Sequence, residues 1–161
     1  MKTFNYHIAK DSKDDSKLSS SSSAFLAGGM TSIPSMKLGL ATYKDIIDIK
    51  HIKKLSGIKV SSKSVTIGST TKHAEVAASK EVKKAIPSLA KLAGGIGDAQ
   101  VRNRGTIGGS IANNDPSACY PSACMALNAI IHTNDRKIEA SKIFKVMFET
   151  ALKKGELIEA V

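Results

Sequence analysis

The chain contains 161 residues, which is about the length of one domain. Its hydrophobic fraction of 42% and charged fraction of 24% are ordinary for a globular protein, and they exclude a wholly disordered chain, a collagen-like fibre and a small disulfide scaffold. The formal net charge is +10, from 24 Lys and Arg against 14 Asp and Glu, which indicates either a lysine-rich solvated surface or a polyanionic partner.

The first 50 residues predict a layer of short strands joined by loops. Residues 4–8 alternate apolar and polar side chains as a strand does, and Ala24–Ala27 is typical of a buried strand that ends in a glycine turn. A third strand is expected at 46–49. Residues 11–23 are rich in Ser and Asp, so they predict an exposed loop or a poorly formed helix.

The rest of the chain predicts hairpins and short helices. Residues 58–61 and 64–68 alternate as a β-hairpin does. A helix capped by Thr70 or Thr71 is expected next, followed by one that starts at Pro87 and ends at Gly94-Gly95. The remaining elements are a strand interrupted by glycines at 106–112, a short helix at 121–127, and strands at 129–133, 136–138 and 156–161. Together they predict a mixed α/β fold, with strands in meanders rather than in regular βαβ alternation.

The charge pattern weighs against a nucleic-acid partner without excluding one. Nearly all cations are Lys, and the arginines are Arg102, Arg104 and Arg136. No run reaches the roughly five basic residues of a nucleic-acid or lipid patch, and aromatic side chains that stack on bases are scarce. No stretch approaches a membrane span of ~18 apolar residues, and the first 30 residues do not read as a secretion signal. The expected location is therefore the cytoplasm.

The cysteines and histidines predict neither a metal site nor a catalytic acid or base. Cys119 and Cys124 cannot supply the four thiolates of a usual iron–sulfur cluster, so both are expected to be free thiols. The four histidines are isolated in the sequence, without the paired spacing of metal ligands.

Two glycine pairs followed by hydroxyl residues are the candidate binding loops. They are Gly28-Gly29-Met30-Thr31-Ser32 and Gly108-Gly109-Ser110. Consecutive backbone amides in such loops form anion-binding concavities, so two loops together could hold a pyrophosphate. A Rossmann fingerprint is not present, because its third glycine would fall at Gln100. Tight turns at strand ends are the alternative interpretation.

The segment 96–121 resembles a known family. Its string Gln100-Val101-Arg102-Asn103-Arg104-Gly105-Thr106-Ile107-Gly108-Gly109 is similar to that of the FAD-binding (medium) subunit of molybdenum hydroxylases, of the carbon monoxide dehydrogenase and xanthine dehydrogenase type. Further similar segments follow in the family's order: Ala27-Gly28-Gly29 with Pro34 and Met36-Lys37-Leu38, Ile67-Gly68 with Thr70-Thr71, Ile86–Leu89, Phe148–Leu152 and Gly155–Ile158. The resemblance covers nearly the whole chain apart from about residues 9–23.

The resemblance implies a PCMH-type FAD-binding fold with FAD held between two small mixed α/β subdomains, residues 1–55 and 56–161. It implies that the pyrophosphate lies on backbone amides of both glycine segments, with Arg102 and Arg104 either contacting the cofactor or bracing the loop. The cofactor-binding residues that it implies are Ala27, Gly28, Gly29, Met30, Thr31, Ser32, Thr106, Ile107, Gly108, Gly109, Ser110, Asn114 and Asp115.

The chain departs from the family pattern at four places, one of which is the Ser- and Asp-rich stretch near residues 9–23, where the family usually has an Ala-rich helix. Cys119 stands where members often carry an Asp that binds ribose, and Met30 stands where many have a polar residue. Family members continue into a third, C-terminal subdomain, whereas this sequence stops at Val161, within the equivalent of the strand that leads there. The expectation is therefore the N-terminal portion of a longer subunit, without its third subdomain.

The function that the resemblance implies is electron transfer in an oxidoreductase. In the family, electrons pass from a molybdenum cofactor on a large subunit, through iron–sulfur clusters of a small subunit, to FAD and then to an acceptor. The protein binds and orients the flavin, and the redox chemistry belongs to the cofactor. Two alternatives remain: a basic nucleic-acid-binding module, and a cofactor-free remnant that docks onto the partner subunits.

Overall fold

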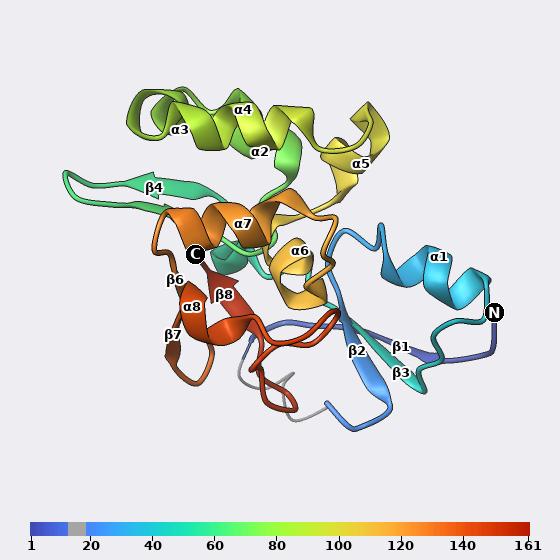
Figure 1. Ribbon diagram of the computed structural model, residues 1–161. Coiled ribbons are helices and arrows are strands. Elements are labelled where there is room, and N and C mark those ends of the chain that lie inside the picture. The colour runs from blue at the N-terminus through green and yellow to red at the C-terminus, as the bar shows by residue number, and fades with distance from the viewer. Residues whose placement is uncertain (13–18) are drawn as a thin grey trace.

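The computed structural model describes residues 1–12 and 19–161, so the loop or helix predicted at 11–23 lies partly outside the described residues. Figure 1 shows the N-terminal strands with α1 on one side of the molecule and the helices α2–α5 at its opposite end. The C-terminal strands lie at the lower left of the view, below α7, and α6 lies near its centre (Figure 1). The mixed α/β fold class predicted from the sequence is confirmed.

The N-terminal sheet consists of three parallel strands in the order β1–β3–β2, namely β1 (Asn5–Ile8), β2 (Ser23–Leu26) and β3 (Asp45–Asp48). All three strands were predicted. Successive side chains of a strand point to opposite faces of its sheet. Ile46 and Ile47 of the central strand are therefore buried in two separate apolar clusters, one on each face.

A helix that the sequence did not predict, α1 (Ser32–Lys37), connects β2 to β3. Parallel neighbouring strands need a crossover connection, and a helix is its usual form. Pro34 lies in the first turn, where a backbone N–H would have no intrahelical partner, so the proline is tolerated. Met36 packs against Leu26 of β2 and Ile46 of β3. The N-terminal strands therefore form a βαβ unit, and the meander predicted for them is wrong.

The predicted hairpin is confirmed as β4 (Ile58–Val60) paired antiparallel with β5 (Val65–Ile67). A short 3₁₀ turn, η2 (Lys53–Leu55), precedes it. The predicted helices that follow are α2 (His73–Ala78) and α4 (Pro87–Gly95).

Three details of this helical group differ from the predictions. The N-cap of α2 is Lys72 rather than a threonine, because the hydroxyl of Thr71 is bonded to the backbone of Gly57. Two further helices, α3 (Lys80–Ala85) and α5 (Ala99–Arg104), are each six residues long. Such short helices present no apolar stripe that periodicity can detect.

The strand predicted at 106–112 is instead a helix, α6 (Ile107–Asn113). The hydroxyl of Thr106 caps its start by accepting the amide of Gly109 at 3.2 Å. Ile107 and Ile111, four residues apart, lie on one helical face and are both buried. Asn114 ends the helix in a left-handed conformation, with φ of +43°. Capping and tertiary burial therefore outweigh the low helix propensity of two adjacent glycines.

The C-terminal part contains α7 (Cys119–Ala126), β6 (Ile130–Thr133), β7 (Lys137–Glu139), α8 (Ala140–Ile143) and β8 (Ile158–Ala160). The three strands, all predicted, form an antiparallel sheet in the order β7–β6–β8. Val161 and Ile67 exchange backbone hydrogen bonds of 2.8 and 2.9 Å, which attach the end of the chain to β5.

The largest apolar core lies between the helices and the C-terminal sheet, and Val76, Ile111, Tyr120 and Ile131 are among its most buried members. A second core includes Ile47 and Leu55 of the N-terminal part together with Leu157, which precedes β8. The C-terminal segment thus packs into the N-terminal core. The division at residue 55 stays a prediction. Over residues 1–12 and 19–161, no helix is both long and apolar enough to cross a membrane.

Candidate functional site

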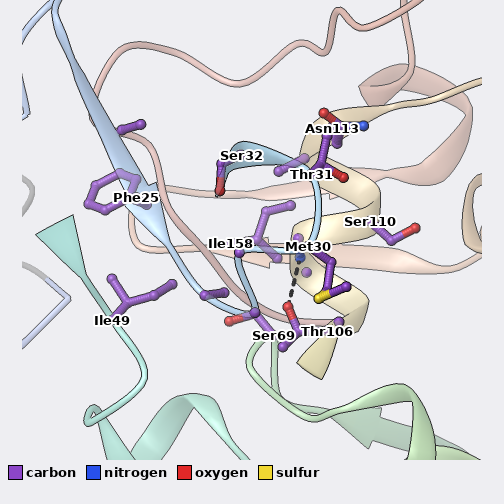
Figure 2. A pocket seen from close by; sticks show the side chains of 18 of the residues that line it. Phe25, Met30, Thr31, Ser32, Ile49, Ser69, Thr106, Ser110, Asn113 and Ile158 are labelled. Carbon is purple, nitrogen blue, oxygen red and sulfur yellow. Dashed lines mark hydrogen bonds between the residues drawn. The ribbon is translucent and has the colours of Figure 1, made fainter. Parts of the chain in front are cut away.

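A cavity of about 470 Å³ lies between the N-terminal sheet and α6, where the two predicted glycine segments meet. Figure 2 shows Met30 and Thr31 of the β2–α1 loop close to Thr106, the N-cap of α6, and to Ser110 of α6. Phe25, Ile49 and Ile158 supply apolar wall (Figure 2). The cavity is within the ~300–1,000 Å³ range of ligand pockets.

All the predicted cofactor-binding residues line this cavity except Ile107 and Asn114. Ile107 is 2% exposed and belongs to the large core. The side-chain amide of Asn114 donates instead to the carbonyls of Val146 and Glu149, at 3.0 and 2.7 Å. The structure therefore brings both glycine segments together but directs these two side chains away from the cavity.

The β2–α1 loop presents a row of backbone amides without a protein acceptor. Gly29 has a φ of +74°, a conformation that glycine adopts without strain. Among the described residues, no hydrogen bond is donated by the amides of Gly28, Gly29, Met30 or Thr31. Successive unpaired amides are a typical anion site, so this loop matches the expectation from its sequence.

The second glycine segment is different, because its amides already have protein acceptors. The amide of Ile107 donates to the carbonyl of Thr71 at 3.2 Å, and that of Gly108 donates to the carbonyl of Ser69 at 2.9 Å. The amide of Gly109 donates to the Thr106 hydroxyl (Figure 2). The implied use of these amides for a pyrophosphate does not match this geometry, since helix formation and the Ser69–Thr71 backbone occupy them. Hydroxyl groups are the donors that this wall offers.

Close packing explains two glycines of the family-like string, Gly105 and Gly108, without reference to a ligand. A Cβ built on Gly108 would lie 2.5 Å from the Cβ of Ser69, and one built on Gly105 would lie 2.5 Å from Nε2 of His73. A Cβ on Gly109 would meet only the Thr106 hydroxyl, at 3.0 Å. Gly109 thus lines the cavity without the close backbone packing that surrounds Gly108.

His73 and Ser69 line the cavity, and sequence reasoning missed both. Ser69 is 3% exposed and His73 is 4% exposed. Neither the Ser69 hydroxyl nor Nδ1 of His73 has a hydrogen-bond partner in the described part of the chain. Burial lowers the pKa of His73 to about 4, so the imidazole is neutral at pH 7. A lone His or Ser carries no pattern in the sequence that would have identified them.

Glu156, a further residue not predicted, lines the cavity as part of a buried ion-pair network. Its carboxylate accepts two hydrogen bonds from Arg136, at 2.9 and 3.0 Å, and one each from the Thr133 hydroxyl and the Lys153 amide. Burial alone raises the pKa of Glu156, but these hydrogen bonds outweigh it and hold the pKa below its ordinary value. The network links Thr133, at the end of β6, and Arg136, just before β7, to the segment that leads into β8.

The arginines of the family-like string differ in what they contact. Arg102 donates to the carbonyls of Ile96 and Gly97, at 3.2 and 3.0 Å, and so braces the turn between α4 and α5. Arg104 contributes its backbone, because its carbonyl lies against Gly28. Of the two expected roles, cofactor contact and bracing of the loop, Arg102 has the bracing role.

Cys119 is an exposed free thiol at the start of α7, and Cys124 is a buried one whose pKa burial raises to about 11. Asp115 lines the cavity and accepts the amide of Ser117 at 2.8 Å. Over the described ranges 1–12 and 19–161, no group of three or more His, Cys, Asp or Glu is arranged to hold a metal ion.

Known proteins that resemble this chain are subunits of dehydrogenases. The glyceraldehyde dehydrogenase medium chain of Sulfolobus acidocaldarius is 38% identical over 140 residues, which cover 84% of this chain and 50% of the relative. The carbon monoxide dehydrogenase medium chain of Hydrogenophaga pseudoflava is 35% identical over 162 residues, covering 96% of this chain and 56% of the relative. The chain thus spans about half the length of these curated relatives.

The fold agrees with solved structures of the same kind. A carbon monoxide dehydrogenase from Hydrogenophaga pseudoflava, which lacks the Mo-pyranopterin moiety of its molybdenum cofactor, superposes with a TM-score of 0.93 at 34% identity, covering 98% of this chain and 57% of that chain. The family described as the FAD binding domain in molybdopterin dehydrogenase matches residues 2–161. The chain therefore belongs to this family of FAD-binding domains, as its glycine segments predicted.

Proposed function

We propose that this chain binds FAD in the cavity between the β2–α1 loop and α6, and that it is the flavin-binding part of the medium subunit of a molybdenum-hydroxylase-type dehydrogenase. Its family is the FAD binding domain in molybdopterin dehydrogenase, and its relatives are named as dehydrogenase medium chains and subunits. This match favours the flavin interpretation over a nucleic-acid-binding module.

The unpaired amides of the β2–α1 loop carry this proposal. The backbone amides of Gly28 through Thr31 lie beside the cavity with no acceptor among the described residues. Buried backbone amides without a partner are rare in folded proteins, because an unmade hydrogen bond is costly once water is displaced. Gly28 is buried and Gly29 and Met30 are half-buried, whereas Thr31 is exposed. An anionic pyrophosphate would supply acceptors for this row. The residues present therefore fit the cofactor of the family.

The other walls suit the remaining parts of a dinucleotide. Thr106 and Ser110 offer hydroxyls opposite the loop, and Phe25 and Ile49 offer apolar surface for an aromatic ring system. Cys119 stands where family members often carry an Asp that binds the ribose. A thiol is a weak acceptor, so the ribose would depend on other groups, and Asp115 lies on the cavity wall.

Bound FAD would supply the redox chemistry, accepting and passing on electrons. The chain itself would bind and orient the flavin, and no residue of it is assigned as a catalytic acid or base. We propose that its partners are an iron–sulfur small subunit and a molybdenum-cofactor large subunit. The lysine-rich surface, with a net charge of +10, would favour acidic faces on those partners.

Titration of the purified chain with FAD tests the proposal. We expect saturable quenching of flavin fluorescence at one FAD per chain. Gly109→Val should abolish this binding and largely preserve the circular dichroism spectrum, because Gly109 lines the cavity and a Cβ there meets the Thr106 hydroxyl, at 3.0 Å, and no neighbouring backbone. If excess FAD is not taken up by the unaltered chain, the proposal is wrong for these 161 residues. Cofactor-independent capture of an iron–sulfur subunit would then favour the docking remnant.

A further inference from the structure

Four buried polar groups have no hydrogen-bond partner within the described part of the chain. They are the hydroxyls of Ser69, Thr70 and Tyr120 and Nδ1 of His73. Burying a hydroxyl without a partner destabilises a fold, so such a group calls for an explanation. Of the three hydroxyls, Ser69 lies on the cavity wall, whereas Thr70 and Tyr120 do not. Ser69 is therefore the residue of these three that borders the cavity.

The backbone of Ser69 is held rigidly on both sides. Its amide donates to the carbonyl of Glu159 at 2.9 Å, and its carbonyl accepts the amide of Gly108 at 2.9 Å. A Cβ on Gly108 would lie 2.5 Å from the Cβ of Ser69, so the side chain is pressed against the first turn of α6. Figure 2 shows Ser69 beside Thr106, with its oxygen pointing toward the side of the cavity where Ile49 lies. The backbone and Cβ of Ser69 are thus held in place before any ligand binds.

In the first turn of α6 the backbone amides are already hydrogen-bonded, and Ser69 offers a hydrogen-bond donor on this side of the cavity. The amides of Ile107, Gly108 and Gly109 donate to protein acceptors, so they are not free to bind an anion. The carbonyl of Ser69 is one of those acceptors, and the Ser69 hydroxyl stands next to it with no acceptor of its own. The Ser69 carbonyl therefore occupies the amide of Gly108, while the Ser69 hydroxyl remains as a donor without a partner among the described residues.

We infer that the Ser69 hydroxyl donates a hydrogen bond to a phosphate oxygen of the bound dinucleotide. This inference rests on the proposed function, because it assigns a phosphate-binding residue within the same cavity. The site binds the anion with neutral donors on both walls: backbone amides from residues 28–31 and a hydroxyl from Ser69.

Replacement of the hydroxyl tests the inference with three probes: FAD, adenosine diphosphate, which keeps the pyrophosphate, and riboflavin, which has no phosphate. Ser69→Ala should weaken FAD and adenosine diphosphate by roughly tenfold, since a hydrogen bond to an ionised group is stronger than a neutral one. Riboflavin affinity should stay unchanged. Flavin fluorescence measures FAD and riboflavin, and titration calorimetry measures adenosine diphosphate.

Thermal unfolding without ligand distinguishes a binding role from a structural one. The melting temperature of ligand-free Ser69→Ala should equal or exceed that of the unaltered chain, because an unpaired buried hydroxyl is removed. Thr70→Val is the matched control, since its hydroxyl is also buried and unpartnered but does not line the cavity. It should leave all three affinities unchanged.

The outcomes separate this inference from the proposed function. If the unaltered chain binds no FAD, the proposed function fails first. If it binds FAD and Ser69→Ala binds FAD as tightly, the Ser69 assignment is overturned. Equal losses for FAD and riboflavin, or an equal effect of Thr70→Val, would also overturn it. Should Ser69→Ala unfold, Ser69→Cys keeps the side-chain size with a weaker donor and must show the same phosphate-dependent loss.

Discussion

The α-carbon of Gly28 rests directly on the carbonyl group of Arg104. A Cβ built on Gly28 would overlap the carbonyl oxygen and would lie 2.8 Å from the carbonyl carbon and 2.9 Å from Cα of Gly105. The β2–α1 loop and the α5–α6 connection, distant in sequence, therefore touch through their main chains. This contact sets the width of one end of the cavity, because neither partner is a side chain that can move aside.

Gly28→Ala should consequently destabilise the protein. The added methyl group has backbone on its far side, so the β2–α1 loop and the α5–α6 connection must separate. We expect a loss of about 1–3 kcal/mol in the free energy of unfolding, as for other overpacking substitutions, and weaker FAD binding. Urea denaturation measures the first effect and fluorescence titration the second.

The matched control for Gly28→Ala is Gly95→Ala. A Cβ on Gly95 would meet nothing within 4 Å, and Gly95 is the last residue of α4. Alanine there should leave stability unchanged or raise it by up to about 1 kcal/mol. Equal behaviour of the two variants would show that the Gly28–Arg104 contact does not limit the fold.

His73 should make the stability of the chain depend on pH. Its ring lies 5.3 Å from that of Tyr120, and burial lowers its pKa to about 4. In the unfolded chain its pKa is about 6.5, so unfolding takes up a proton when the pH lies between about 4 and 6.5. The contribution of His73 to stability is complete above pH 6.5 and is lost as the pH falls toward 4, by up to about 3 kcal/mol.

Denaturation in urea at pH 7 and pH 5 measures this effect. Carboxyl groups such as Glu156 also titrate on the acid side, so the informative quantity is the difference between the unaltered chain and His73→Gln. The variant should lose less stability between the two pH values. An identical loss would place the histidine in an environment where it can be protonated without unfolding.

Arg136→Met should destabilise the chain, because it leaves the buried carboxylate of Glu156 without its cationic partner. The Glu156 side chain is 2% exposed, and Arg136 supplies two of its hydrogen bonds. Removing one partner of a buried pair is costly, but the Arg136 side chain is 38% exposed and solvent screens part of the effect. We expect a loss of roughly 2–3 kcal/mol, measured by chemical denaturation.

The double variant Arg136→Met with Glu156→Gln is the control for this prediction. It removes the buried charge as well as its partner, so it should recover much of the lost stability. The contribution of Glu156 itself, whose folded pKa is lowered, should be present at neutral pH and disappear as the solution becomes acidic. A double variant as unstable as Arg136→Met would argue against a charge effect.

Asn114 should order the exposed segment that contains Val146 and Phe148. Its backbone carbonyl accepts the Phe148 amide at 3.0 Å, and its side-chain amide holds the carbonyls of Val146 and Glu149. Asn114→Gly keeps the left-handed backbone but loses the side-chain bonds, whereas Asn114→Ala also strains the backbone. Trypsin cleavage after Lys145 should therefore accelerate in both variants, and more with alanine. Unchanged cleavage would contradict this role.

The sequence predicted most strands and the general position of the cavity, because these depend on local pattern. Alternating or continuous apolar runs correctly indicated β1, β2 and β3, the β4–β5 hairpin and the strands of the C-terminal sheet. The glycine–hydroxyl segments and the family resemblance indicated the two sides of the cavity. The family resemblance could be identified from the order of residue types alone, without knowing which residues are in contact.

Tertiary structure alone decided which groups face the cavity and which are occupied. Local pattern favoured a strand at residues 106–112, but burial of Ile107 and Ile111 and capping by Thr106 make this segment a helix. The amides of Ile107 and Gly108 then pair with Thr71 and Ser69, partners set by long-range packing. The unpartnered hydroxyl of Ser69 is visible only in three dimensions for the same reason. Periodicity reports which side of an element is apolar, whereas hydrogen-bond accounting requires every neighbour to be in place.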